Sequence, residues 1–117
     1  MREALRDPSR LKHMVDSINN VNQYMEGKTE SDLAANSMLF YAVVKNIEIV
    51  GEAAYKLTHE FKDAHPSTPW RHIVAMRHIL VHGYYQVTTS EVFNVYKKDL
   101  PILLNQLEKY LEEILDR

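Results

Sequence analysis

Apolar residues recur at steps of three and four along most of the chain, which is the period of an amphipathic α-helix. The first stripe follows Asp7 and Pro8 and stops before Gly27, and it comprises Leu11, Met14, Val15, Ile18, Val21 and Met25. Proline is tolerated in the first turn of a helix, and glycine commonly ends one. We therefore expect a helix from Asp7 to near Gly27, followed by a short turn or helix over residues 29–35 capped by Thr29 or Ser31.

A second long apolar stripe covers residues 36–61 and contains a glycine in its interior. Its members are Leu39, Ala42, Val43, Ile47, Val50, Ala54, Leu57 and Phe61. Glycine inside a helix costs about 1 kcal/mol relative to alanine, so its presence needs a packing reason. Gly51 therefore predicts that another helix crosses this one at close range.

Two further helices follow the break at HPSTPW. We expect Thr68 to cap the third helix, which ends at Gly83 and carries Ile73, Met76, Leu80 and Val81. Thr88 and Glu91 have the spacing of a capping box and open a fourth helix, which Pro101 must kink or divide. The pattern contains no strand and no repeat. It predicts one all-α domain over residues 1–117, a bundle of four or five antiparallel helices.

Composition excludes several classes of protein. A chain of 117 residues with 45% hydrophobic residues can form one domain with a real core. The absence of cysteine excludes disulfides, thiolate metal sites and cysteine nucleophiles. Neither a signal peptide nor an apolar run of about 18 residues is present, so we expect a cytoplasmic protein that does not enter a membrane.

The net charge of −2 hides an uneven distribution. No aspartate or glutamate occurs from Ala64 to Ser90, a window that holds two arginines and four histidines, namely Arg71, Arg77, His65, His72, His78 and His82. A local positive site on an acidic body attracts anions such as phosphate. The alternative interpretation is a buried helix that simply avoids carboxylates, and composition favours neither.

The run MRHILVHGYY, residues 76–85, carries most of the candidate chemistry. Arg77 and His82 are five residues apart, so they diverge by about 140° on a regular helix. The helix end at Gly83 would release His82 from that direction. A symmetric dimer would instead bring His82 of one copy near Arg77 of the other.

Structural roles also explain these residues. A histidine such as His82 can bind the last carbonyls of a helix, and Arg77 can pair with Glu48 or Glu52, which lie four apart on the second helix. Tyr84 and Tyr85 have the character of interface residues.

Metal binding has less support in the sequence. His78 and His82 have the spacing of helical zinc ligands, but the glutamate that accompanies such pairs and a third ligand are missing. We expect no metal site.

The functional interpretation uses Arg77 and His82 jointly. Histidine can take or give a proton near neutral pH, and arginine binds phosphate through its planar fork. Together they can cleave RNA without a metal: a 2′-hydroxyl attacks the adjacent phosphorus, which leaves a cyclic phosphate and a 5′-hydroxyl end.

The run RHILVHGYY resembles the R-x-x-x-x-H-x-Y motif of HEPN ribonucleases, in the form found in HepT-like toxins of the HepT–MntA toxin–antitoxin systems. Three longer blocks are similar to that family's second helix, third helix and last helix: AVVKNIEIVGEAAYKL, PSTPWRHIVAMRHILVHGYY and VFNVYKKDLPILLNQLEKYL. The resemblance covers nearly the whole chain and implies a HEPN-type helical bundle.

The resemblance implies an endoribonuclease toxin with Arg77 and His82 as catalytic residues, RNA as substrate and no cofactor. His78 takes a polar position where asparagine is the commoner choice. Tyr84 aligns with the tyrosine that an MntA-like minimal nucleotidyltransferase antitoxin modifies with AMP. Family members form homodimers with the two motifs facing one groove, and assembly with the antitoxin can follow. We add the inference that Glu52 orients Arg77.

Two other functions are compatible with the sequence. One is a catalytically inactive helical binding module that partners a nucleotidyltransferase. The other is a nucleotide-binding domain in which Arg77 and the histidines contact phosphate.

Overall fold

The computed structural model describes residues 5–83 and 86–115. These residues form a helical bundle without a strand, which confirms the predicted all-α fold. The helices are, in chain order, α2 (Asp7–Met25), α3 (Glu30–Ala35), α4 (Ser37–Lys56), α5 (His59–Ala64), α6 (Trp70–His82), α7 (Thr89–Asn94), the π-helical stretch η2 (Val95–Asp99) and α8 (Leu100–Leu115).

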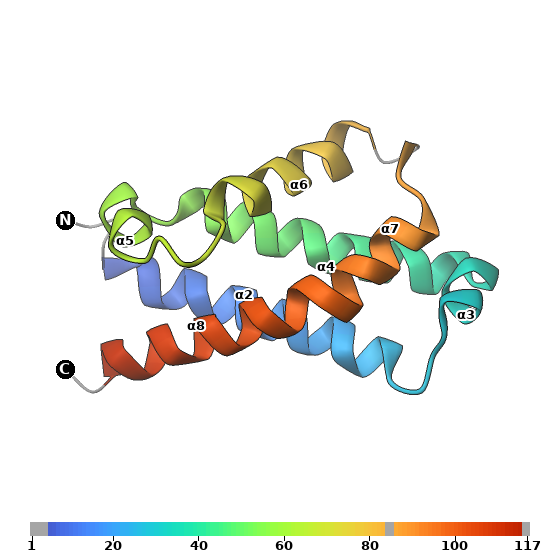
Figure 1. Cartoon of the computed structure of the whole chain (residues 1–117), viewed down its shortest axis with the longest axis horizontal. Helices are drawn as coiled ribbons and strands as arrows, with labels where there is room; N and C mark the ends of the chain where they lie inside the picture. Colours follow the sequence, from blue (N-terminus) through green and yellow to red (C-terminus); the bar gives the residue numbers. More distant parts are fainter. Residues whose placement is uncertain (1–4, 84–85, 116–117) are drawn as a thin grey trace.

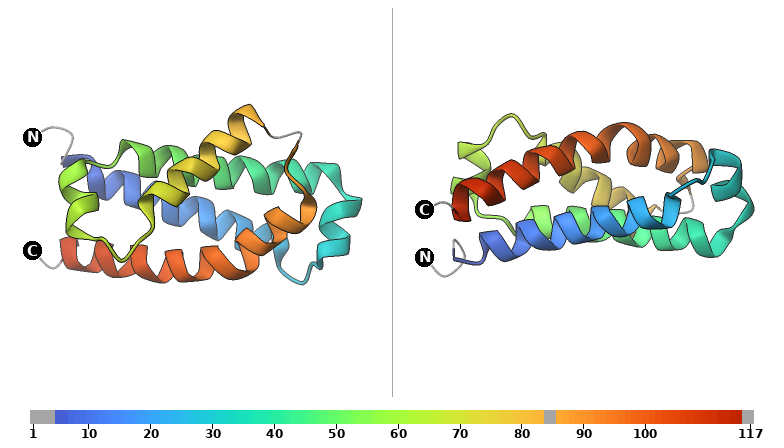
Figure 2. Two further views of the ribbon diagram at one scale, coloured as in Figure 1. Left: turned by 45° about the horizontal axis from the view of Figure 1, so that its top comes forward. Right: turned by 90° about the horizontal axis from the view of Figure 1, so that it is seen from below.

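The long helices α2, α4 and α8 run lengthwise, and α6 crosses α4 obliquely (Figures 1 and 2). α4 packs against both α2 and α6, and α2 packs against α8. The start of α2 and the end of α8 lie at the same end of the bundle as α5, whereas α3 lies at the opposite end (Figure 1). α4 therefore sits between the helix that carries the candidate motif and the N-terminal helix.

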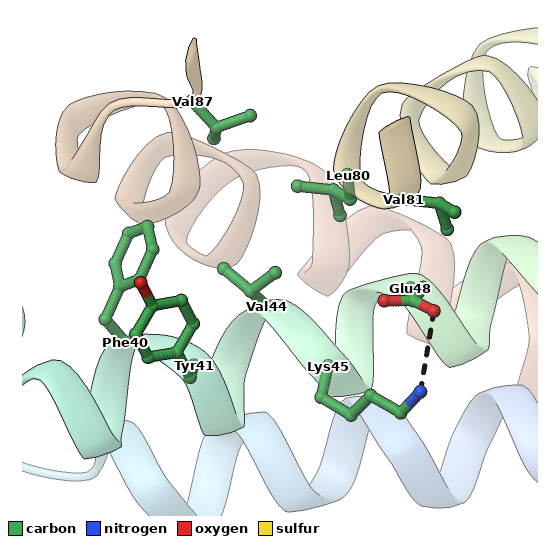
Figure 3. Close-up of a pocket in the computed structure, with 8 residues that line it drawn as sticks. All are labelled: Phe40, Tyr41, Val44, Lys45, Glu48, Leu80, Val81 and Val87. Atoms are coloured by element: carbon green, nitrogen blue, oxygen red, sulfur yellow. Dashed lines mark hydrogen bonds and ion pairs between the residues drawn. The ribbon is translucent and has the colours of Figure 1, made fainter. Parts of the chain in front are cut away.

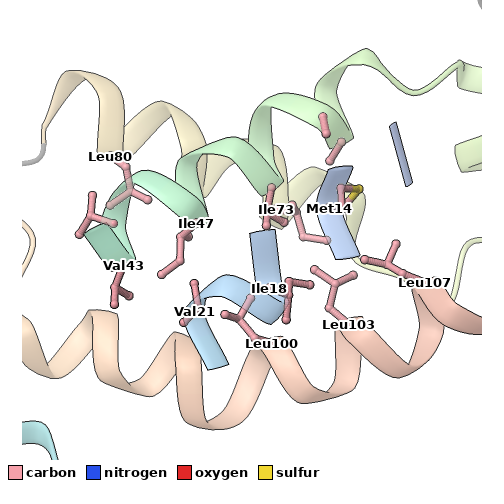
Figure 4. Packing of buried hydrophobic residues seen from close by; sticks show 14 of the residues in the cluster. Met14, Ile18, Val21, Val43, Ile47, Ile73, Leu80, Leu100, Leu103 and Leu107 are labelled. Carbon is pink, nitrogen blue, oxygen red and sulfur yellow. The ribbon is translucent and has the colours of Figure 1, made fainter. Parts of the chain in front are cut away.

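The core lies where these long helices face one another. Leu100 and Leu103 of α8 point toward Val21 and Ile18 of α2, and Leu107 points toward Met14 (Figure 4). Val43 and Ile47 of α4 and Ile73 and Leu80 of α6 complete the same cluster. Burying one such side chain contributes about 1.5–3 kcal/mol, so the apolar stripes of the sequence hold the bundle together.

The first helix and its termination follow the sequence pattern. α2 begins at Asp7 and ends at Met25, and Gly27 takes a φ of 72°, a conformation that glycine adopts without steric cost. Thr29 is the cap of α3: its hydroxyl accepts a hydrogen bond from the Asp32 N–H, and the Asp32 side chain accepts one from the Thr29 N–H. These hydrogen bonds lower the pKa of Asp32.

The second apolar stripe is divided between two helices, so the prediction of one helix over residues 36–61 is wrong. α4 ends at Lys56, and Thr58 starts α5 by accepting a hydrogen bond from the Phe61 N–H. The Thr58 N–H and hydroxyl both donate to the buried carboxylate of Asp7, at 3.0 and 2.7 Å. This long-range pair holds the chain out of the helix at Thr58, and periodicity alone does not reveal it.

Thr68 does not cap α6, contrary to the prediction. Its side chain is buried, and its hydroxyl lies 2.8 Å from Gln106 Oε1 and 2.6 Å from the hydroxyl of Tyr110. The residue that precedes α6 is Pro69, which makes no side-chain cap. The hydroxyl therefore bonds across the bundle to α8 rather than along its own helix.

Pro101 lies in the first turn of α8, directly after the π-helical stretch η2. Proline lacks the N–H that a continuous α-helix requires, and the π turn changes the register at that point. The last helix is thus divided near Pro101, as expected. No helix of the described residues is long and apolar enough to cross a membrane.

Candidate active site

The crossing of α4 and α6 positions Arg77. A Cβ atom added to Gly51 would collide with the Cβ of Arg77 and would lie 3.1 Å from the carbonyl oxygen of Ile73. Both neighbours are fixed to the α6 backbone, so any larger residue would push the two helices apart. The prediction of a close helix crossing at Gly51 is confirmed, and this crossing sets the base of the Arg77 side chain directly on α4.

Glu52, the next residue on α4, meets the Arg77 guanidinium. Its Oε2 lies 2.8 Å from Arg77 Nε, and its Oε1 lies 3.7 Å from the ammonium of Lys56. The Arg77 Nε atom is buried, yet no described acceptor lies along its N–H direction, so the contact is an ion pair without a well-aligned hydrogen bond. Arg77 and Glu52 are 32% and 39% exposed, so their pair adds at most about 1 kcal/mol to stability.

Glu48, the other carboxylate considered as a partner of Arg77, points elsewhere. It lies 3.5 Å from the ammonium of Lys45 on its own helix. Of the two carboxylates on α4, only Glu52 pairs with Arg77 in the described part of the chain. The contact agrees with the inference that Glu52 orients Arg77, and the catalytic role of this pair stays a prediction.

His82 is the last residue of α6 and is exposed. Its ring centroid lies 4.7 Å from that of His78, which is also exposed, as their four-residue spacing predicts. The helix ends at Gly83, whose N–H donates to the Ile79 carbonyl at 2.7 Å. Within residues 5–83 and 86–115, neither histidine ring has a hydrogen bond or an ion pair with another side chain or with the backbone.

A single chain does not join the two predicted catalytic residues. Arg77 faces α4 and Glu52, whereas His82 is exposed beside His78, and no interaction between Arg77 and His82 occurs among the described residues. This separation agrees with the divergence expected from helical geometry. Tyr84 and Tyr85 lie outside the described residues.

The sequence did not reveal an open pocket between α4 and the last turns of α6 (Figure 3). It has a volume of about 550 Å³, and Val44, Leu80 and Val81 give it an apolar floor. Tyr41 and the Lys45–Glu48 pair line the same pocket. An aromatic ring beside charged groups can accept a planar heterocycle. In the sequence, this pocket is marked by the polar stripe at positions 41, 45 and 48 of α4.

No group of three histidine, aspartate or glutamate side chains comes together as metal ligands in the part of the chain that the structure describes. The described groups available for chemistry at the C-terminal end of α6 are the guanidinium, the two imidazoles and the carboxylate already named. A guanidinium binds phosphate oxygens, and an imidazole transfers protons.

Comparisons with known proteins identify a family and several relatives of this chain. The family described as "Ribonuclease HepT-like" matches residues 14–110. A Methanocaldococcus jannaschii protein named "Gamma-glutamylcyclotransferase and putative RNase" is 36% identical over 104 residues, which are 89% of this chain and 47% of that protein. The chain thus spans about half the length of that relative.

Two further relatives match along most of their length. A Caldanaerobacter subterraneus subsp. tengcongensis protein named "Putative RNase" is 31% identical over 92% of both chains. A "Probable ribonuclease HepT" from Thermococcus cleftensis is 29% identical over 85% of this chain and 90% of its own. The comparison with solved structures found no match. Because the family match covers most of the chain and the Caldanaerobacter relative matches nearly end to end, this protein belongs to the HepT-like ribonuclease family.

Proposed function

We propose that this protein is a metal-independent endoribonuclease toxin that cleaves RNA with Arg77 and His82. Family membership supports RNA as the substrate. The observation that carries the proposal is the contrast on α6: Arg77 is anchored by Glu52, while His82, five residues on, is exposed at the helix end with only His78 beside it. One cation is thus held in place and one proton-transfer group is accessible.

The proposed reaction is an internal transfer. The imidazole of His82 takes the proton of a ribose 2′-hydroxyl, and the 2′-oxygen attacks the neighbouring phosphorus. The bond from phosphorus to the 5′-oxygen breaks, and that oxygen takes a proton from water, whose hydroxide then takes the proton that His82 accepted. The products are a 2′,3′-cyclic phosphate and a 5′-hydroxyl. The guanidinium of Arg77 offsets the charge that accumulates on the non-bridging phosphate oxygens.

The divergence of Arg77 and His82 supports a site shared between two copies. We propose a homodimer in which Arg77 of one protomer and His82 of its partner act on the same phosphate. Two inactive variants then complement each other. A mixed dimer of Arg77→Ala and His82→Ala chains holds one intact site, so mixing and re-equilibrating the two proteins should restore part of the activity. A site within one chain would show no recovery.

Cleavage itself is tested with a purified protein and labelled RNA in EDTA. Removing a general base typically costs 10²–10⁴-fold in rate, so His82→Ala should lose about that much activity. His72→Ala is the matched control, because His72 is exposed near the other end of the same helix. Equal cleavage by wild type and His82→Ala would overturn the role of His82. Absence of cleavage by the wild type would favour a catalytically inactive binding module.

We also propose that a partner nucleotidyltransferase silences the enzyme by attaching AMP to Tyr84. The support is the position of Tyr84 two residues after His82, where an added phosphate would compete with RNA for Arg77. Co-expression with such a partner should add AMP to the peptide that contains Tyr84, as seen by mass spectrometry. An adduct that persists in Tyr84→Phe would count against this residue.

A further inference from the structure

A second pocket lies on the side of α4 that faces α2, with a volume of about 300 Å³. Four of the residues that line it are basic types: Arg6, Arg10, His13 and Lys56. Among the described residues, its lining also includes one carboxylate, that of Glu52. The whole chain has a net charge of −2, so this concentration of cations is local.

The basic pocket shares a wall with the candidate active site. The Glu52 carboxylate lines the pocket and lies between two cations, with one oxygen 2.8 Å from Arg77 Nε and the other 3.7 Å from Lys56 Nζ. An anion in the pocket is therefore separated from Arg77 by one side chain. The carboxylate is shared between both cations.

Helix geometry explains why the basic residues converge. Arg6, Arg10 and His13 follow one another at steps of four and three, which places them on one face at the start of α2. Arg10 Nη1 donates to the main-chain carbonyl of Lys56, the last residue of α4. This bond ties the two helices together at the pocket and is a structural role for Arg10. Neither the ammonium of Lys56 nor the ring of His13 takes part in this hydrogen bond.

We propose that this pocket binds a backbone phosphate of the RNA substrate next to the phosphate that Arg77 holds. The inference rests on the proposed ribonuclease function, because it places a strand at Arg77. Lys56 follows Glu52 by four residues on α4, about 6 Å along the axis. That step is comparable to the separation of neighbouring phosphates on a single strand. The guanidinium of Arg77 and the flexible ammonium of Lys56 are both suited to phosphate contacts, which do not read the base.

The test uses RNA binding rather than cleavage. A 2′-O-methyl oligonucleotide lacks the attacking hydroxyl, so fluorescence anisotropy can follow its binding to the intact protein over a series of salt concentrations. Each phosphate contact on a single strand contributes about 0.7 to the slope of log affinity against log salt. Lys56→Gln should lower the slope by about 0.7, which corresponds to about fivefold weaker binding at 0.1 M salt relative to 1 M.

A matched pair of charge changes separates the pocket from general electrostatics. His13→Glu places a negative charge in the pocket, whereas Lys12→Glu acts on the neighbouring exposed residue, outside it. Lys12→Glu removes a positive charge and adds a negative one, so it changes the net charge at least as much. We expect His13→Glu to weaken binding at least threefold more than Lys12→Glu, with unchanged circular dichroism and thermal melting in both.

The outcomes distinguish the two proposals. Equal weakening by His13→Glu and Lys12→Glu, an unchanged slope in Lys56→Gln, or no RNA binding by the wild type would each overturn the phosphate pocket. If the slope falls as expected but the wild type cleaves no RNA, the pocket stands and the proposed catalytic function fails. The proposal would also be overturned if His13→Glu or Lys56→Gln changed the binding of an acidic protein but left RNA binding unchanged.

Discussion

The two ends of α6 carry the same kinds of residues and use them differently. Before its first turn, the ring of His65 lies between Phe61 and Tyr110, with centroids 4.2 and 4.3 Å away. Its Nδ1 lies 2.8 Å from the Phe61 carbonyl, and the Trp70 indole N–H donates to the His65 carbonyl at 2.9 Å. This histidine is part of an aromatic cluster that closes the end of the bundle.

At the other end of α6, His78 and His82 are exposed, and their described contact is with each other. Arg77 is anchored by one carboxylate and by the crossing at Gly51. The fold uses the first set of side chains to close its core. It holds the second set in position without consuming its hydrogen-bonding groups, which leaves them able to bind another molecule.

The largest effect expected from this difference is on activity, through Arg77→Lys. Lysine keeps the charge but lacks the planar fork, so it cannot hold a phosphate by two parallel bonds. Losing one donor of this type typically costs about 10²–10³-fold in rate. Stability should change by less than about 1 kcal/mol, because the pair with Glu52 is partly exposed. Single-turnover cleavage of labelled RNA and urea unfolding measure the two quantities.

Arg71→Lys is the matched control for Arg77→Lys. Arg71 is an exposed arginine in the first turn of the same helix. If Arg71→Lys reduced cleavage as much as Arg77→Lys, the two ends of α6 would not differ in function. A loss of several kcal/mol of stability in Arg77→Lys would instead assign Arg77 to the fold.

The sequence predicts those features that depend on neighbours in the chain. The helical stripes, the capping of α3 and the close crossing at Gly51 follow from local pattern and from the cost of glycine. The break between α4 and α5 and the partners of Thr68 were missed, because both depend on residues far away in the sequence. Periodicity identifies which residues share a helix face but not which distant side chain satisfies a hydroxyl.

The same limit applies to the candidate site. The inference that Glu52 orients Arg77 named the carboxylate that the structure pairs with it, but spacing alone also left Glu48 open as an ion-pair partner. The basic pocket combines residues of α2 and α4 that are about 40 or more positions apart, such as His13 and Lys56. The separation of Arg77 from His82 needed only the geometry of one helix, and the sequence predicts it.

A smaller effect is expected at the closed end, through Tyr110→Phe. The Tyr110 hydroxyl lies 2.6 Å from the buried Thr68 hydroxyl, which lies 2.8 Å from Gln106 Oε1. Thr68 has one proton and gives it to Gln106, so Tyr110 is the donor to Thr68. Removing the donor should cost about 1 kcal/mol of unfolding free energy, measured with urea. Tyr24→Phe, on a partly exposed tyrosine of α2, is the control and should be neutral.

The catalytic readout of Tyr110→Phe sharpens the comparison. Because Tyr110 belongs to the closed end, the rate of cleavage per folded molecule should equal that of the wild type. A fall comparable to that of Arg77→Lys, with stability unchanged, would show that the aromatic cluster acts on the substrate. The division of α6 into a structural end and a functional end would then be wrong.

The smallest effect concerns how stability depends on pH at the closed end, through Lys62→Met. Burial lowers the pKa of Lys62 from 10.5, against the raising influence of Asp7 and Asp63. The folded chain therefore binds this proton less well than the unfolded chain. Stability rises with pH between the lowered folded pKa and 10.5, and the buried charge costs stability below that window.

Methionine removes the charge while it keeps most of the length of the side chain. The stability of the wild type minus that of Lys62→Met should therefore increase as the pH rises toward 10.5, as followed by urea unfolding at each pH. The variant also loses the contacts of the ammonium with the carbonyls of Ala54 and Tyr55, at 3.3 and 3.5 Å, so the measurement is how the difference changes with pH rather than its size at one pH. If this difference in stability does not vary with pH, burial does not destabilise the charged form of Lys62. Cleavage at neutral pH should be unchanged, because Lys62 lies on α5, away from the end of α6 that carries His82.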